Sequence, residues 1–158
     1  MNKGNKYYIA HGFFINTARM ADKCPTAAVV CNSELKGYRL RFRGADAEAV
    51  AAVEPDKDAA VPVLVWEITP ADEAALDRCE GFPSLCSKET VKVRLDGKIA
   101  NALAYIPNIE GLPPGRPGTF HYNNILEGYE AAGFDTGILK KALAESVETE
   151  VTPADAPL

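Results

Sequence analysis

The sequence predicts an α+β fold, a small closed or curled mixed β-barrel of about six strands with flanking helices. Three observations support this prediction. At 158 residues with 47% hydrophobic content, the chain can fill one core but is too short for two ordinary domains. About six strand-like segments are spread along it, and the helical segments fall between them without regular βαβ alternation. We therefore expect one domain over residues 5–147 and a disordered tail over residues 148–158.

The first segments are predicted to be a strand, a short helix and two further strands. Aromatic and β-branched residues run together over residues 7–10 and stop near a glycine, which indicates a buried strand. Asn16 can cap a short helix that runs to about Asp22. Residues 26–44 predict two strands, and over residues 38–43 apolar side chains alternate with arginines. This alternation predicts a sheet with one face in water.

The middle of the chain predicts two more strands and the clearest helix. Residues 47–68 hold two strands around an acidic turn at residues 55–58. Thr69 then caps a helix that has Pro70 at its first position and acidic residues in its first turn. Gly81 is expected to end this helix.

A β-hairpin follows. Apolar residues alternate along residues 89–95, reach Asp96-Gly97, and return through residues 99–105, which is the strongest short-range hairpin signal. A loop rich in proline and glycine occupies residues 107–118.

Two helices are predicted to end the domain. Thr119 is expected to cap the first, which contains the sequence FHYNNILEGYEAAG. Asp135 is expected to begin the second, which runs to about Val147.

Charge and hydropathy exclude several classes of partner. The 22 acidic and 17 basic residues are interspersed and give a net charge of −5, with no basic run that could follow a phosphate backbone. No segment approaches the roughly 20 consecutive apolar residues of a membrane span, and the apolar run near the start is too short for a signal peptide. We expect a cytoplasmic protein that binds neither nucleic acid nor membrane and is, by default, a monomer.

The cysteines predict no metal site. Cys24, Cys31, Cys79 and Cys86 form two C-x6-C pairs, whereas a zinc site usually places two thiolates two residues apart. In a reducing cytosol we expect buried free thiols rather than a disulfide or a catalytic thiol.

Four segments in order resemble the gamma-glutamylcyclotransferase-like, or AIG2-like, family. They are YIAHGFFINTARM (8–20), VLVWEITPADEAALDRCEGFP (63–83), KETVKVRLDGKIANALAYI (88–106) and PGTFHYNNILEGYEAAG (117–133). The resemblance implies a small closed β-barrel with flanking helices, in agreement with the strand count. It also implies that the α-amine of a γ-glutamyl group attacks its own γ-amide and releases 5-oxoproline and an amine. No cofactor is needed for that reaction.

The resemblance assigns Glu80 as the catalytic acid and base. Apolar neighbours at the end of a helix could desolvate this carboxyl and raise its pKa towards the range that a base requires. By the same match, the backbone N–H groups around His11, Gly12, Phe13 and Phe14 would hold the α-carboxylate or the carbonyl oxygen of the substrate.

The chain departs from the family around this site. His11-Gly12-Phe13-Phe14 replaces Tyr-Gly-Ser-Asn, and His121 stands where a family tyrosine is expected. Cys79 and Cys86 likewise replace tyrosines. If both histidines faced one pocket, they could titrate near neutral pH. These changes predict an altered ligand or a lost activity.

The rival hypothesis is a non-catalytic module that binds a small ligand or a protein on the same scaffold. Exposure of both Phe13 and Phe14 at a pocket mouth would favour that module, because contiguous apolar surface usually marks an interface. Inward packing of both rings, with Glu80 facing a cavity of ligand size, would favour the enzyme. The residues alone do not separate such an enzyme from one that acts on γ-glutamyl-lysine isopeptides or deacylates a biosynthetic intermediate.

Overall fold

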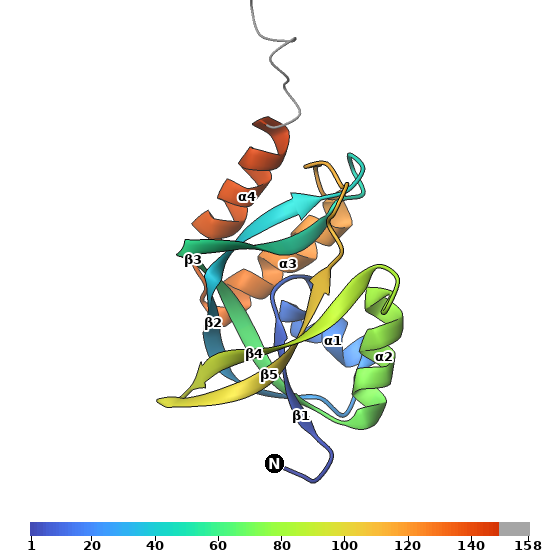
Figure 1. Ribbon diagram of the computed structural model, residues 1–158, viewed down its shortest axis with the longest axis vertical. Coiled ribbons are helices and arrows are strands. Elements are labelled where there is room, and N and C mark those ends of the chain that lie inside the picture. The colour runs from blue at the N-terminus through green and yellow to red at the C-terminus, as the bar shows by residue number, and fades with distance from the viewer. Residues whose placement is uncertain (149–158) are drawn as a thin grey trace, which may run out of the picture.

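The structure, a computed structural model, describes residues 1–148 and has the predicted α+β architecture (Figure 1). Its strands are β1 (Lys6–Ala10), β2 (Ala28–Arg43), β3 (Val50–Ile68), β4 (Cys86–Leu95) and β5 (Lys98–Pro107). Its helices are the 3-10 turn η1 (Phe13–Ile15) and the α-helices α1 (Thr17–Lys23), α2 (Pro70–Glu80), α3 (Thr119–Ala132) and α4 (Thr136–Glu148). All but the first residue of the predicted disordered tail lie outside the described residues.

The strands form one mixed, curled sheet in the order β2-β3-β1-β5-β4. Central β1 pairs antiparallel with β3 and parallel with β5, and β4 and β5 form the predicted hairpin. Within residues 1–148 no hydrogen-bonded ladder joins β2 to β4, so the sheet is not closed and the prediction of a closed barrel is not confirmed. A side-chain hydrogen bond spans this gap, donated by Ser33 Oγ to the Arg94 carbonyl oxygen at 2.8 Å.

The prediction of about six strands was wrong because two expected breaks are bulges inside long strands. Lys36 pairs with Ala60 and Tyr38 pairs with Pro55, so residues 56–59 bulge out opposite Gly37 while the ladder continues on both sides. A bulge can absorb extra residues and bend a strand without ending its pairing. The predicted acidic turn is therefore part of β3.

Most helix boundaries agree with the predictions. Asn16 caps α1 through its side-chain oxygen, Thr69 and Asp72 form a capping box at α2, and Gly81 ends α2 in the left-handed conformation with φ of +71°. The predicted cap of α3 was wrong: Gly118 is the N-cap, it makes no side-chain bond, and Thr119 is already helical.

Helix α3 is anchored to η1, and this contact places the start of α3 opposite the end of β1. Asn16 Nδ2 donates to the carbonyl oxygen and to Oδ1 of Asn124, at 3.1 and 3.2 Å. Gly128 permits close approach, because a Cβ there would lie 2.8 Å from Asn16 N and 2.9 Å from Ile15 C. The sequences of two distant segments thus bring α3 and the β1–η1 turn side by side.

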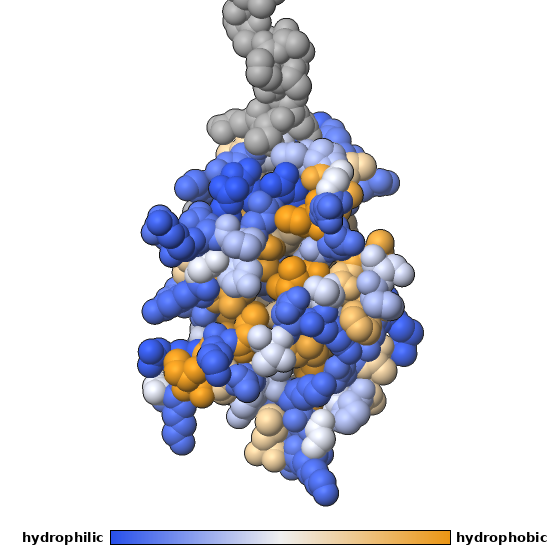
Figure 2. All heavy atoms as spheres, in the orientation of Figure 1, coloured by the Kyte–Doolittle hydropathy of each residue, from blue (hydrophilic) through white to orange (hydrophobic). Residues whose placement is uncertain are grey.

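The cysteines are all free thiols, as predicted, but not all are buried. Cys24 and Cys86 are buried, Cys31 is half-buried and Cys79 is exposed. The surface view in Figure 2 shows hydrophobic residues gathered near the middle of one face, surrounded by hydrophilic ones. Among residues 1–148, no helix has the length and hydropathy needed to cross a membrane.

Candidate active site

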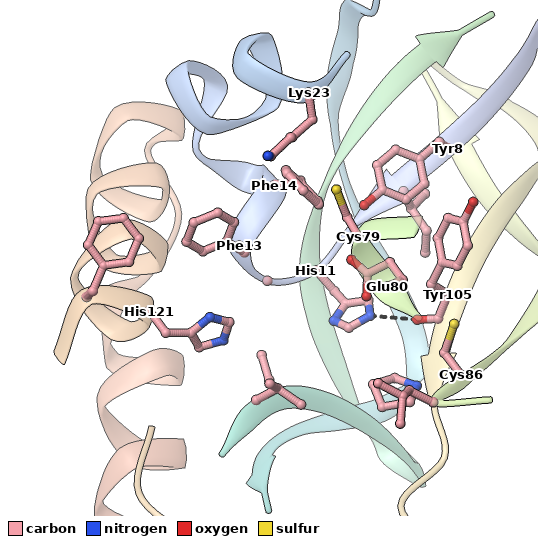
Figure 3. Close-up of a pocket in the computed structure, with 17 residues that line it drawn as sticks. Tyr8, His11, Phe13, Phe14, Lys23, Cys79, Glu80, Cys86, Tyr105 and His121 are labelled. Carbon is pink, nitrogen blue, oxygen red and sulfur yellow. Dashed lines mark hydrogen bonds between the residues drawn. The ribbon is translucent and has the colours of Figure 1, made fainter. Parts of the chain in front are cut away.

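Every site residue predicted from the sequence lines one cavity of about 530 Å³ (Figure 3). Its walls come from the β1–η1 turn, the end of α1, the beginning of β3, the α2–β4 junction, the end of β5 and the beginning of α3. The predicted residues that line it are His11, Gly12, Phe13, Phe14, Glu80 and His121. The two histidines therefore share one cavity.

Glu80 occupies the last turn of α2 and its carboxyl faces the cavity. The helix ends immediately after it, where Gly81 N donates to Arg78 O and Phe82 N donates to Asp77 O. The Glu80 side chain makes no hydrogen bond or ion pair with any residue in the described part of the chain. Burial of this carboxyl raises its pKa from 4.5 to about 7. It can therefore both accept and return a proton near neutral pH.

Ion pairs and hydrogen bonds hold α2 against the β4–β5 hairpin. Lys88 Nζ on β4 lies 2.8 Å from both Glu73 Oε2 and Asp77 Oδ1, and the Tyr105 hydroxyl donates to Asp77 Oδ1 at 2.5 Å. Loss of solvent and this bond to Asp77 raise the pKa of Tyr105. The helix that carries Glu80 is thus attached to β5, which forms the neighbouring wall of the cavity.

His11 is also attached to Tyr105, and this contact determines its tautomer. Its Nε2 lies 3.0 Å from the Tyr105 carbonyl oxygen, which can only accept, so Nε2 carries the proton. Nδ1 is buried and has no partner among the described residues. Burial lowers the pKa of His11, so the ring is neutral at neutral pH and Nδ1 is a free hydrogen-bond acceptor.

The turn after β1 brings backbone to the cavity wall. A Cβ on Gly12 would lie 3.1 Å from Ala51 Cβ, so glycine allows this approach. Phe13 and Phe14 open η1, and the first N–H groups of a helix have no partner within it. No residue in 1–148 accepts a hydrogen bond from these N–H groups. The turn can offer donors to an anion or a carbonyl oxygen.

The opposite wall is aromatic. The Phe13 and His121 rings are parallel, with centroids 5.5 Å apart, and Phe120 lies 6.0 Å from Phe13. Phe14 is buried, with 6% of its surface exposed, and Phe13 is half-buried between these neighbours. Burial lowers the pKa of His121 below its ordinary value. Burial thus shifts both histidines towards the neutral form.

Tyr8, Lys23, Tyr105 and Phe120 also line the cavity, and sequence reasoning missed all four. Tyr8 could have been found, because it precedes Gly12 on the predicted strand. Tyr105 gives no local signal, since its place depends on the parallel pairing of β1 with β5. Lys23, at the end of α1, makes no ion pair in the part of the chain that the structure describes. Within that part, no group of three or more metal-ligating side chains could hold an ion.

Comparison with known proteins points to one family. The sequence model described as "Gamma-glutamyl cyclotransferase, AIG2-like" matches residues 12–122. No curated protein matches the chain significantly.

Solved structures show the same fold at low sequence identity. A gamma-glutamyl cyclotransferase has a TM-score of 0.75 and 23% identity, over 87% of this chain and 86% of the other. An uncharacterized protein from Homo sapiens has a TM-score of 0.73 and 22% identity, over 99% and 93%. A yeast gamma-glutamyl cyclotransferase specific to glutathione has a TM-score of 0.64 and 12% identity, over 92% and 96%.

Proposed function

The chain belongs to the gamma-glutamyl cyclotransferase, AIG2-like family, and from this premise we propose that it cyclises a γ-glutamyl amine or peptide. The α-amine nitrogen of the glutamyl group forms a bond to the γ-amide carbon. The bond from that carbon to the leaving nitrogen then breaks, and 5-oxoproline and a free amine are released. Ring closure is intramolecular, so a cavity that holds the glutamyl group bent supplies part of the rate enhancement.

Glu80 is the proposed acid and base. The substrate α-amine is protonated in solution, with a pKa of roughly 8, and must lose a proton before or during attack. Glu80, whose pKa is about 7, takes that proton and returns it to the leaving nitrogen. The attacking nitrogen loses a second proton as it becomes the ring amide. That proton ends on the released amine, which departs as an ammonium ion, and the carboxylate is regenerated for the next turnover.

The β1–η1 turn and Lys23 supply the complementary charges. The free N–H groups of Phe13 and Phe14 can hold the amide oxygen as it gains negative charge. The Lys23 ammonium at the cavity wall attracts the glutamyl α-carboxylate.

His11 is the proposed acceptor for the remaining protons of the substrate amine. Its buried Nδ1 lone pair has no partner among the described residues, and a buried acceptor left unpaired is costly. A substrate N–H that reaches Nδ1 removes this cost and orients the attacking nitrogen. This contact supports the binding of a γ-glutamyl group despite the loss of the family's Ser-Asn side chains.

The single observation that carries the proposal is the isolated, desolvated Glu80 carboxyl in a cavity of ligand size. The test is 5-oxoproline release from a panel of γ-glutamyl amino acids, γ-glutamyl amines and glutathione. Glu80→Gln keeps the shape of the side chain and removes the base, so we expect turnover to fall by roughly 10²–10⁴-fold. A matched Glu89→Gln variant on exposed β4 should retain wild-type turnover.

The rival binding module is less favoured by the packing. Exposure of both Phe13 and Phe14 would favour it, whereas Phe14 is buried and Phe13 packs against His121. Absence of turnover on the whole panel by folded wild-type protein would reject the enzyme and favour the binding module.

A further inference from the structure

The α3 side of the cavity is a continuous aromatic surface, which we call the aromatic wall and define as Phe13, Phe120 and His121. Phe13 lies at its centre, in parallel contact with His121 and in tilted contact with Phe120. The three rings come from η1 and from the first turn of α3, and the contact of Asn16 with Asn124 joins these two elements. Figure 3 shows Phe13 and His121 across the cavity from Glu80 and His11.

Three exposed apolar side chains line the cavity, and we call them its rim. Phe120 is 67% exposed, Leu85 is 70% exposed and Val50 is 42% exposed, and all three line this cavity. Covering such side chains with an apolar group stabilises a complex in proportion to the area removed from water. The rim is therefore suited to an apolar part of a ligand.

Charge is scarce in the same cavity. Of the described residues that line it, only Lys23 and Glu80 carry ordinary charged side chains. The proposed function uses both for the glutamyl group, because Lys23 pairs with its carboxylate and Glu80 exchanges a proton with its amine. Among the described lining residues, no second cation is left for a carboxylate on the leaving group. A peptide such as the cysteinylglycine part of glutathione would bring such a carboxylate to the apolar rim.

We propose that the leaving group is an arylalkyl amine without a carboxylate, whose ring packs on the aromatic wall. Flat rings stack on such surfaces with a geometric preference beyond area burial. This inference rests on the proposed function, because it assigns the part of the substrate that the cyclisation releases. It adds a substrate class, which the chemistry at Glu80 does not determine.

The test compares γ-glutamyl amides that differ only in the leaving amine. The 2-phenylethyl and 2-cyclohexylethyl amides have rings of similar size, and two carbons separate each ring from the reacting nitrogen, so their intrinsic reactivities match. The ethyl amide lacks the ring, and glutathione carries the extra carboxylate. We expect kcat/KM for the phenylethyl amide to exceed that for the cyclohexylethyl amide by roughly threefold to tenfold.

Two variants test whether the preference for the phenylethyl amide comes from the aromatic wall. Phe120→Ala should reduce the ratio of the phenylethyl to the ethyl amide towards one, because it removes the exposed ring. Ile99→Ala truncates another exposed apolar side chain, 57% exposed and outside the cavity, and should leave the ratio unchanged. Equal kcat/KM for all four substrates, or a ratio that Phe120→Ala does not change, would overturn the inference while the cyclotransferase function stands.

A binding measurement decides the inference even without turnover. Titration calorimetry of the amides with Glu80→Gln measures affinity independently of chemistry. Tighter binding of the phenylethyl amide than of the cyclohexylethyl amide, weakened by Phe120→Ala, would support the aromatic wall even if the wild-type protein released no 5-oxoproline. Equal binding of the two amides would reject it.

Discussion

At the scale of single residues, the burial of Glu80 both suits it to the proposed proton transfer and destabilises the folded protein. The same burial that raises its pKa to about 7 makes its charged form costly in the folded protein. Because the pKa is higher in the folded than in the unfolded chain, the folded state binds the proton more tightly. That stabilisation is complete below pH 4.5 and is lost as pH rises through about 7.

We therefore predict that Glu80→Gln becomes more stable than the wild type as pH rises. The difference in free energy of unfolding should grow by roughly 3 kcal/mol between pH 4.5 and pH 8, the equivalent of the pKa shift. Urea unfolding at both values measures it. A difference that is the same at both pH values would show that the carboxyl is solvated in the folded protein.

Catalytic activity should rise with pH, whereas the stability of the wild-type protein relative to Glu80→Gln falls. The base must be deprotonated to accept a proton from the substrate, so kcat/KM should rise as pH increases through about 7, the pKa of Glu80. Initial rates of 5-oxoproline release between pH 5 and pH 9 test this expectation. A profile that is flat across pH 7 would exclude Glu80 as the titrating base.

Two substitutions at His11 separate its two nitrogen atoms. Gln can keep a donor to Tyr105 O but has no acceptor in place of Nδ1, whereas Asn keeps an acceptor near Nδ1 and loses that donor. We expect His11→Gln to reduce kcat/KM by roughly threefold to tenfold with little loss of stability. His11→Asn should reduce the melting temperature more and kcat/KM less. If kcat/KM falls only in step with the melting temperature in both variants, the role of His11 is purely structural.

At the scale of elements, the end of α2 determines where Glu80 lies. Gly81 has φ of +71°, and a Cβ there would lie 2.7 Å from Leu85 Cδ1 and 2.9 Å from Leu85 Cβ. Gly133 ends α3 with a similar φ of +77°, but a Cβ there would meet nothing within 4 Å. Alanine at either position would have the same left-handed backbone strain, but only at position 81 would its Cβ clash with Leu85.

Gly81→Ala should therefore disturb the active site more than Gly133→Ala. Both variants should lose roughly 1 kcal/mol of unfolding free energy from the left-handed backbone. Only Gly81→Ala should also lower kcat, because Leu85 must move and the last turn of α2 moves with it. Paired denaturation and activity measurements check this, and equal kcat values for the two variants would contradict it.

Elements that depend on neighbours close in sequence could be predicted, and features that depend on distant contacts could not. The caps at Asn16 and Thr69 and the turn at Asp96-Gly97 depend on neighbours within a few residues, and the sequence predicted them correctly. The bulge opposite Gly37 does not depend on near neighbours alone, because paired residues of β2 and β3 on both sides maintain it. The cap of α3 was misassigned because a threonine one residue beyond Gly118 has the same local preference.

At the scale of the whole molecule, the site is assembled from segments far apart in the chain. The family resemblance located Glu80 and the β1–η1 turn, and the structure shows that they share a cavity with His121. Sequence alone could not reveal that Tyr105 bonds to both α2 and His11, because that arrangement depends on the curl of the sheet. The aromatic wall likewise exists only because α3 packs on η1.

Separating α3 from η1 should consequently impair the site more than the fold. A Cβ on Gly128 would meet backbone atoms of Asn16 and Ile15, at 2.8 and 2.9 Å, which cannot rotate away. We predict that Gly128→Ala costs roughly 1–3 kcal/mol of unfolding free energy and shifts α3 outward. The shift would separate His121 from Phe13, and kcat/KM for γ-glutamyl amides should fall with it.

The matched control is Gly137→Ala on α4, where a new Cβ would meet only the Asp135 carboxylate, at 2.9 Å. Asp135 Oδ1 accepts a hydrogen bond from Gly137 N at 2.9 Å, and rotation of the carboxylate would break it. The preference for alanine over glycine in a helix, about 1 kcal/mol, offsets that loss. Gly137→Ala should therefore keep both stability and activity. Comparing the unfolding free energy and the kcat/KM of the two variants tests the role of the α3–η1 contact. If Gly128→Ala unfolds at a lower denaturant concentration but retains full kcat/KM, α3 contributes to stability alone and the cavity does not depend on its position.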